Sequence, residues 1–233
     1  MIQTIYRVLI DFYDKILSMN SLLWIGFLSL LFWGIYQKWD EKRMSYTEHP
    51  VRTSLYFFFS SLALILVYPN IANLFKPSFL SILFFIFTIA LTFFLYKVLK
   101  SLFRGPKDDF QTDHAYWKLL DQKYLAPKLF EIGFQQTFLG AVYIVLIETF
   151  TLKTEIIILI ILAFILAHVP LIFLQSKKIG LTYLKWSIIG APLFAFIIIA
   201  TNCLWYSISI HMLFYTLLSM ATWLFTGTKY SDD

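Results

Sequence analysis

Residues 128–150 read KLFEIGFQQTFLGAVYIVLIETF, an apolar stretch that is long enough to enter a lipid bilayer as a helix. Its first half carries Glu131 and the two amide side chains of Gln135 and Gln136. An ionisable group inside a membrane-entering helix is energetically costly, so Glu131 is a candidate for function. The stretch therefore predicts a membrane helix and, on it, part of a site.

Two histidines lie in comparable surroundings further along the chain. His168 ends the run FILAH at residues 164–168, and His211 lies in the run IHMLFY at residues 210–215. Each run belongs to an apolar segment of its own. Three ionisable residues on three separate apolar segments indicate one shared pocket, because unpaired ionisable groups are too costly to scatter through a membrane.

The composition defines the class of protein. Of 233 residues, 59% are hydrophobic and 20% aromatic, and the mean hydropathy is +0.72, which exceeds what a soluble domain needs. The charged residues, 14% of the chain, cluster between the apolar runs. We therefore predict an all-α fold, a polytopic transmembrane helical bundle with contacts to membrane lipids. The net charge of +5 does not indicate nucleic-acid binding, because the basic residues lie beside predicted spans. The single cysteine excludes an intrachain disulfide and a zinc–thiolate cluster.

The apolar runs predict about seven spans in one membrane-embedded domain, residues 18–233. Residues 1–17 alternate apolar and charged groups, which predicts an amphipathic helix at the membrane interface; a short extension of the first span is the alternative. The predicted spans are residues 18–37, 53–74, 78–99, 128–150, 155–175, 180–201 and 203–226.

Prolines and small residues mark the expected boundaries. Pro69 should break the end of the second span, and Pro127 should begin the fourth. Pro170 predicts a kink beside His168. The small residues at 190–192 should allow close helix packing, and residues 113–125 could form a surface helix.

The distribution of lysine and arginine predicts the orientation, because cytoplasmic loops carry an excess of these residues. The loops after the first, third and fifth spans are basic, whereas the loops between them are nearly free of basic residues. We therefore expect Lys38–Arg52 and Lys100–Lys128 to be cytoplasmic loops, with the N-terminus outside and the tail inside. The basic residues concerned are Lys38, Lys42, Arg43, Arg52, Lys100, Arg104, Lys107, Lys118, Lys123, Lys128, Lys177 and Lys178.

The order of the polar residues resembles the three motifs of the CPBP family, which includes type II CAAX prenyl endopeptidases and bacterial proteins linked to bacteriocin processing and self-immunity. The family's second motif, Phe-x-x-x-His, matches Phe164 and His168. Its third motif, His-x-x-x-Asn, matches His211 but has Tyr215 in place of asparagine. The resemblance covers residues 127–218.

The first motif of that family, Glu-Glu-x-x-x-Arg, matches in one of two registers. In the first register Phe130 replaces the first glutamate, Glu131 matches the second, and Gln135 replaces the arginine. In the second register Glu131 is the first glutamate, with Ile132 and Gln136 as the departures.

The resemblance implies an intramembrane endopeptidase in the bacterial inner membrane, an integral multi-pass protein that cuts a membrane-associated or lipidated peptide. Glu131 and His168 would activate a water, and His211 would stabilise the oxyanion. Tyr215 and Gln135 would contact the substrate or the oxyanion. No cofactor is implied, the need for a metal stays open, and the partners would be a peptide or lipoprotein substrate and other membrane proteins.

Other hypotheses remain open for the same residues. The departures in the first and third motifs favour a non-catalytic membrane scaffold or a subunit of a larger complex. A bis-histidine metal or haem site on His168 and His211 lacks supporting ligands, and a transporter lacks an internal repeat. Glu131 could be an interfacial carboxylate, His168 could simply bond a neighbouring carbonyl, and Gln135 and Gln136 could join helices.

Overall fold

The computed structural model describes residues 28, 32, 35, 49–102, 122–150, 153–169 and 177–226. Over these residues the secondary structure is helical, with no strand, which confirms the all-α prediction. The predicted interfacial helix at 1–17 lies outside the described residues. The same holds for the predicted first span, apart from Leu28, Phe32 and Ile35, which are helical.

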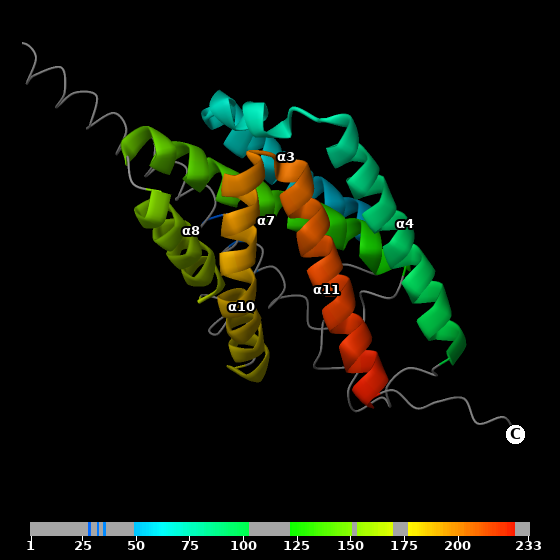
Figure 1. The fold of residues 1–233 in the computed structure, drawn as a ribbon. Coiled ribbons are helices and arrows are strands. Elements are labelled where there is room, and N and C mark those ends of the chain that lie inside the picture. The colour runs from blue at the N-terminus through cyan, green and yellow to red at the C-terminus, as the bar shows by residue number, and fades with distance from the viewer. Residues whose placement is uncertain are drawn as a thin grey trace, which may run out of the picture.

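Six α-helices and one 3-10 helix follow in the described part of the chain (Figure 1). Each predicted segment from the second to the seventh overlaps one of the α-helices. Four helices, α3, α4, α7 and α10, are long and apolar enough to cross a membrane. The prediction of seven spans stays a prediction. In order, the elements are α3 (Pro50–Val67), η1 (Pro69–Phe75), α4 (Phe79–Leu102), α7 (Gln122–Thr149), α8 (Lys153–His168), α10 (Lys177–Thr201) and α11 (Leu204–Thr226).

Proline positions explain where two of these helices begin or end. The α3 helix ends at Val67 and Pro69 begins η1, so the expected break at this proline is present. The expectation that Pro127 begins a helix was wrong, because α7 begins at Gln122 and contains Pro127. Residues 122–126 are mostly good helix formers, and the proline removes only the hydrogen bond to the Lys123 carbonyl near the helix start.

The basic loops are shorter than the sequence predicted. Residues 50–52 already belong to α3, α4 continues to Leu102, and residues 122–128 belong to α7. The part of the predicted surface helix before Gln122 lies outside the described residues, and Leu125 is buried within α7. Lys128 is therefore a helical and buried residue rather than a loop residue, with a side chain only 5% exposed.

The α8 helix ends at His168, and Val169 follows in a turn. The residue before a proline is disfavoured in the helical conformation, which agrees with a helix end at this point. The rest of the predicted span 155–175 and the expected kink at Pro170 stay predictions. Residues 170–176, including that proline, lie outside the described residues. This end places His168 on the last turn of α8.

The α7 helix occupies the interior of the bundle. In its apolar stretch Leu125–Glu148, 72% of residues are buried, compared with 17% in α3 and in α4. Figure 1 shows α7 crossing α10 and α11, and α3 runs parallel to it. The parallel pairing follows from two contacts: the Phe57 and Phe134 rings lie 5.9 Å apart, and Tyr68 donates to Glu148 at the far end.

Two glycines set how closely the helices approach. A Cβ atom at Gly140 would lie 3.0 Å from Leu204 Cδ2 and 3.1 Å from Leu74 Cδ1, so this glycine lets α7 approach α11 and η1. At Gly190 a Cβ atom would lie 2.9 Å from Phe194 Cε2. Gly190 therefore leaves room for Phe194, a residue of its own helix, and the neighbouring Ala191 is fully buried.

Asn202 forms the connection between α10 and α11. Its φ of 47° is left-handed, a conformation that asparagine adopts more readily than most residues. Its backbone N–H donates to the Ile198 carbonyl at 2.8 Å, which closes the end of α10. This tight reversal places α11 antiparallel to α10 (Figure 1).

Large apolar side chains cover the outer faces of α3, α4 and α10. Examples are Phe59, Phe79, Phe94 and Phe196, each more than half exposed. Contiguous apolar surface of this kind is unfavourable in water and marks contact with a membrane or a partner. Together with the four long apolar helices, it is consistent with a membrane protein.

Candidate functional site

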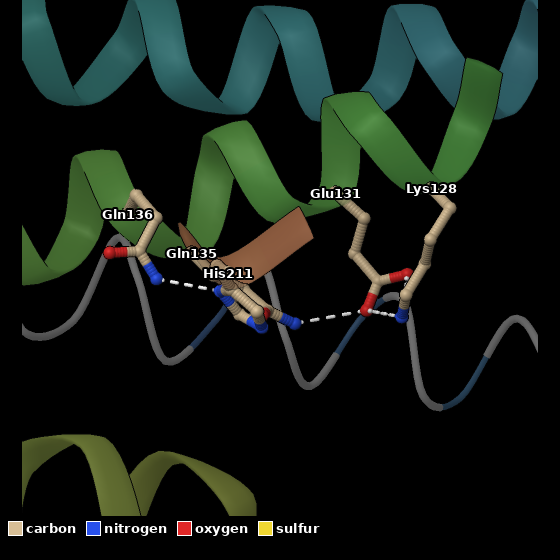
Figure 2. Close-up of polar contacts among 5 residues, drawn as sticks. All are labelled: Lys128, Glu131, Gln135, Gln136 and His211. Atoms are coloured by element: carbon tan, nitrogen blue, oxygen red, sulfur yellow. Dashed lines mark hydrogen bonds and ion pairs between the residues drawn. The ribbon is translucent and has the colours of Figure 1, made fainter. Parts of the chain in front are cut away.

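The charged part of the site lies along one face of α7. Lys128 Nζ donates to both carboxylate oxygens of Glu131 at 2.9 Å, and Gln135 Nε2 donates to Glu131 Oε1 at 2.9 Å. These residues are spaced by three and four positions, which places them on the same face of a helix. Figure 2 shows their side chains, with that of His211, on the side of α7 that faces away from α3.

A second polar group joins α7 to α11. Gln136, which is fully buried, bonds His211 Nδ1 through its amide nitrogen at 2.7 Å (Figure 2). Ser207 Oγ donates to the other end of the same amide, Gln136 Oε1. Because the amide oxygen accepts from serine, the amide NH₂ donates to Nδ1 of the histidine. His211 therefore accepts at Nδ1 and, as a neutral imidazole, carries its proton on Nε2.

His168 has the opposite arrangement. Its Nδ1 lies 2.8 Å from the Phe164 carbonyl oxygen, one helical turn earlier. A carbonyl only accepts, so Nδ1 is the protonated nitrogen, and the lone pair of a neutral ring is on Nε2. The expected bond from His168 to a neighbouring carbonyl is present, although the carbonyl is that of Phe164 rather than the one that Pro170 would release. Among the described residues, no hydrogen bond reaches Nε2 of either histidine.

Aromatic rings hold the two histidines close together. Phe164 lies 4.7 Å from the His168 ring and 6.2 Å from the His211 ring, measured between centroids. Phe194 of α10 stacks on His211 at 4.3 Å and contacts Phe164 at 5.5 Å. Both imidazoles are therefore packed against the same pair of phenylalanines, which restricts the planes of the rings.

The polar residues of the three helices lie in one connected region. His168 and His211 contact Phe164. Glu131 pairs with Lys128, whose Nζ lies over the ring of Tyr215, one helical turn after His211. The structure thus brings together the three residues that the sequence singled out, from α7, α8 and α11. Whether they act in catalysis stays a prediction.

Tyr215 contributes its ring to the charged part of this cluster. Lys128 Nζ lies 4.3 Å from the centroid of that ring, in the position of a cation–π contact. The side chain is buried, at 5% exposed. Tyr215 therefore borders the site, and its predicted role toward an oxyanion stays a prediction, as does the predicted substrate contact of Gln135.

Sequence reasoning missed three residues of the site, Lys128, Phe194 and Ser207, and it missed the donor role of Gln136. Lys128 was counted among the loop lysines, although its spacing of three residues from Glu131 is typical of a helical ion pair. Ser207 precedes His211 by one helical turn, which is a comparable signal. Phe194 carried no signal, because an aromatic residue in an aromatic-rich helix looks like ordinary packing.

Comparisons with known proteins do not identify the chain: no family model, no curated protein and no solved structure matches it. The resemblance to the CPBP family therefore stays a prediction. Within the described ranges, no group of three or more histidine, cysteine, aspartate or glutamate side chains could hold a metal ion.

Proposed function

We propose that the chain is a multi-pass protein of the bacterial inner membrane that hydrolyses an amide bond in a membrane-associated or lipidated peptide. This is the activity that the resemblance to the CPBP family implies. The observation that carries the proposal is the difference in the hydrogen-bond partners of the two Nδ1 atoms. That of His168 lies 2.8 Å from a carbonyl oxygen and that of His211 lies 2.7 Å from an amide nitrogen. His168 offers an acceptor at Nε2, whereas His211 offers a donor at Nε2.

Each residue then has a defined chemical role. His168 Nε2 takes a proton from water as the resulting hydroxide attacks the scissile carbonyl, and it later returns that proton to the leaving amine. His211 Nε2–H donates to the oxyanion of the tetrahedral intermediate. Glu131 is assigned an electrostatic role, in which its negative charge favours the imidazolium that forms during the reaction.

Lys128 restricts what Glu131 can do in this scheme. Both carboxylate oxygens accept from Lys128, and Oε1 also accepts from Gln135. Both oxygens of this carboxylate are thus already engaged, whereas within the described residues no hydrogen bond reaches Nε2 of His168. We therefore assign the proton transfer to His168 and an electrostatic role to Glu131, in contrast to a shared role of the two as base.

The same ion pair favours a second candidate, a non-catalytic membrane scaffold or subunit. In that case Lys128 and Glu131 would only neutralise each other, and Gln136 with His211 would only join α7 to α11. The two candidates differ in one respect: a scaffold tolerates loss of a base or donor at the histidines, provided that the fold is kept.

The test uses the full chain in liposomes with fluorogenic peptides that carry a prenylated cysteine, an acylated cysteine or no lipid. His168→Gln should lower the cleavage rate by about 10²–10⁴-fold, the usual contribution of a general base. His211→Gln should lower it by about 10²–10³-fold, the usual cost of losing an oxyanion donor. The same substitution at the exposed His49, at the start of α3, is the control and should have no effect.

Two outcomes would decide against catalysis. One is a Glu131→Ala, His168→Ala double variant that cleaves as fast as the unaltered chain. The other is a folded, unaltered chain that cuts none of the peptides, which would favour the scaffold.

A further inference from the structure

The path from Ser207 through Gln136 to His211 is closed to solvent along its whole length. Gln136 and Ser207 are 0% exposed, and His211 is 7% exposed. Water therefore cannot replace either partner of the amide, and the direction of the hydrogen bonds is fixed by the chain itself. A serine hydroxyl that donates to the amide oxygen leaves only NH₂ donors for the histidine.

We propose that Gln136, oriented by Ser207, is a positioning residue that holds His211 in its neutral form with the proton on Nε2. The use of that proton toward an oxyanion rests on the proposed function, but the tautomer itself does not. Ser207 lies outside the three motifs of the CPBP family. Gln136 falls within the first motif only in the second register, where it replaces the family's arginine. Gln136 acts through His211 and is not itself placed against a substrate.

Glutamine fits this role better than other polar residues of its size. Glutamate at position 136 would have no N–H to donate, and both of its oxygens would accept. His211 would then have to present Nδ1–H, which moves the proton to the opposite side of the ring or charges the ring. Leucine would fill a similar volume but leave Nδ1 without a partner, so that neither tautomer would be selected.

The ring plane of His211 is held by a separate set of contacts. Phe194 stacks on the ring with an interplanar angle of 27°, and Gly190 leaves the space that the phenylalanine occupies. These contacts fix the plane but do not distinguish the two nitrogens, because an aromatic face contacts both. The choice of tautomer therefore depends on Gln136, and this separates it from a residue that only joins two helices.

The experiment is nitrogen-15 NMR of the full chain in lipid nanodiscs, with labelled histidine. The chain has four histidines, and the signals of His211 are identified by their loss in His211→Asn. In the unaltered protein, Nε2 should give a protonated, pyrrole-type signal and Nδ1 an unprotonated, pyridine-type signal. Gln136→Glu should place the proton on Nδ1, either by reversing the assignment or by protonating both nitrogens, and Gln136→Leu should give a mixture of tautomers.

Gln135→Leu is the matched control, because Gln135 is the adjacent glutamine and bonds Glu131 rather than His211. Its His211 signals should equal those of the unaltered chain. A proton on Nδ1 of His211 in the unaltered chain would overturn the proposal, even if no variant folds. An unchanged His211 spectrum in a folded Gln136→Glu variant would overturn it as well.

The nitrogen-15 spectra and the cleavage assay together distinguish this inference from the proposed function. If the unaltered chain cleaves none of the peptides, but His211 carries its proton on Nε2 and Gln136→Glu moves that proton to Nδ1, the inference holds and the proposed function is refuted. If the chain cleaves peptides but His211 carries its proton on Nδ1, the hydrolytic function holds and the inference about Gln136 is refuted.

Discussion

Removing one partner of the ion pair between Lys128 and Glu131 should destabilise the fold, whereas removing both partners together should not. The two side chains are 5% and 14% exposed, so neither charge is well hydrated. Lys128→Met removes the ammonium and keeps the length of the side chain. Glu131→Gln removes the negative charge and keeps an oxygen that can accept from Gln135. The double variant removes both charges at once.

The expected magnitudes follow from the burial of the pair. Each single variant removes the opposite charge beside a largely buried ionisable group, which costs about 3–5 kcal/mol of unfolding free energy. For Glu131→Gln we expect the lower end, about 3 kcal/mol, because the ring of Tyr215 still faces the lysine and attracts a cation. The double variant should lie near zero or be more stable by about 1–4 kcal/mol, since it avoids the desolvation of both charges.

The assay is reversible unfolding of the full chain in mixed micelles, followed by circular dichroism, for the two single variants and the double variant. The three free energies give a coupling energy, which we expect to be about 6 kcal/mol or more, because two single losses of about 3 kcal/mol or more are absent from the double variant. The control is Glu155→Gln, the same substitution at an exposed glutamate in the first turn of α8. Its cost should stay at about 0.3–1 kcal/mol, the usual interaction of a charge with a helix end. Additive single variants that each cost less than about 1 kcal/mol would refute the reasoning, because that is how a solvated surface pair behaves.

Three further predictions concern packing and orientation. Gly140→Ala should lower the unfolding free energy by about 1–3 kcal/mol, because the added Cβ would force α7 away from α11 and η1. Gly133→Ala is the control and should stabilise the protein slightly, because an added Cβ there meets nothing within 4 Å. Equal effects of the two substitutions in the same unfolding assay would contradict the close approach at residue 140. Asn202→Gly should leave stability nearly unchanged and Asn202→Val should lower it by about 1–2 kcal/mol, because valine disfavours the left-handed conformation; equal stabilities would contradict that conformation. The orientation can be tested in a chain whose native cysteine is replaced by serine. A membrane-impermeant thiol reagent should label Lys76→Cys in intact cells but should label Lys42→Cys only after permeabilisation. Labelling of Lys42→Cys in intact cells, with Lys76→Cys protected, would overturn the predicted orientation.

The helices themselves could be predicted because apolar length is a strong signal. A run of about 20 apolar residues between charged clusters leaves few structures other than a membrane-entering helix. The residues Glu131, His168 and His211 could also be singled out, since an ionisable side chain is conspicuous in such a run. Their approach to one another could be expected from the free-energy cost of burying an unpaired ionisable group, without knowledge of which helices are neighbours.

Helix boundaries and partners could not be predicted in the same way. Whether Lys128 lies in a loop or inside α7 depends on where the helix begins, and Pro127 suggested a later start than the one observed. The burial of Lys128 depends on α11, which supplies Tyr215 from a distant part of the chain. The protonation of His211 depends on Ser207 bonding the far end of the Gln136 amide, a contact between helices that no local pattern encodes.

The position of the polar residues follows from how deeply each helix is buried. α3 and α4 expose most of their surface, and their charged residues lie only near their ends, at Arg52, Lys97 and Lys100. On the exposed faces of these two helices an ionisable side chain would have no partner from the bundle. α7 is enclosed by other helices, so its polar groups can meet a partner from their own turn or from α11. The most enclosed of the long apolar helices described is therefore the one on which a water-excluding site could form, because its neighbours supply the hydrogen bonds that lipid cannot.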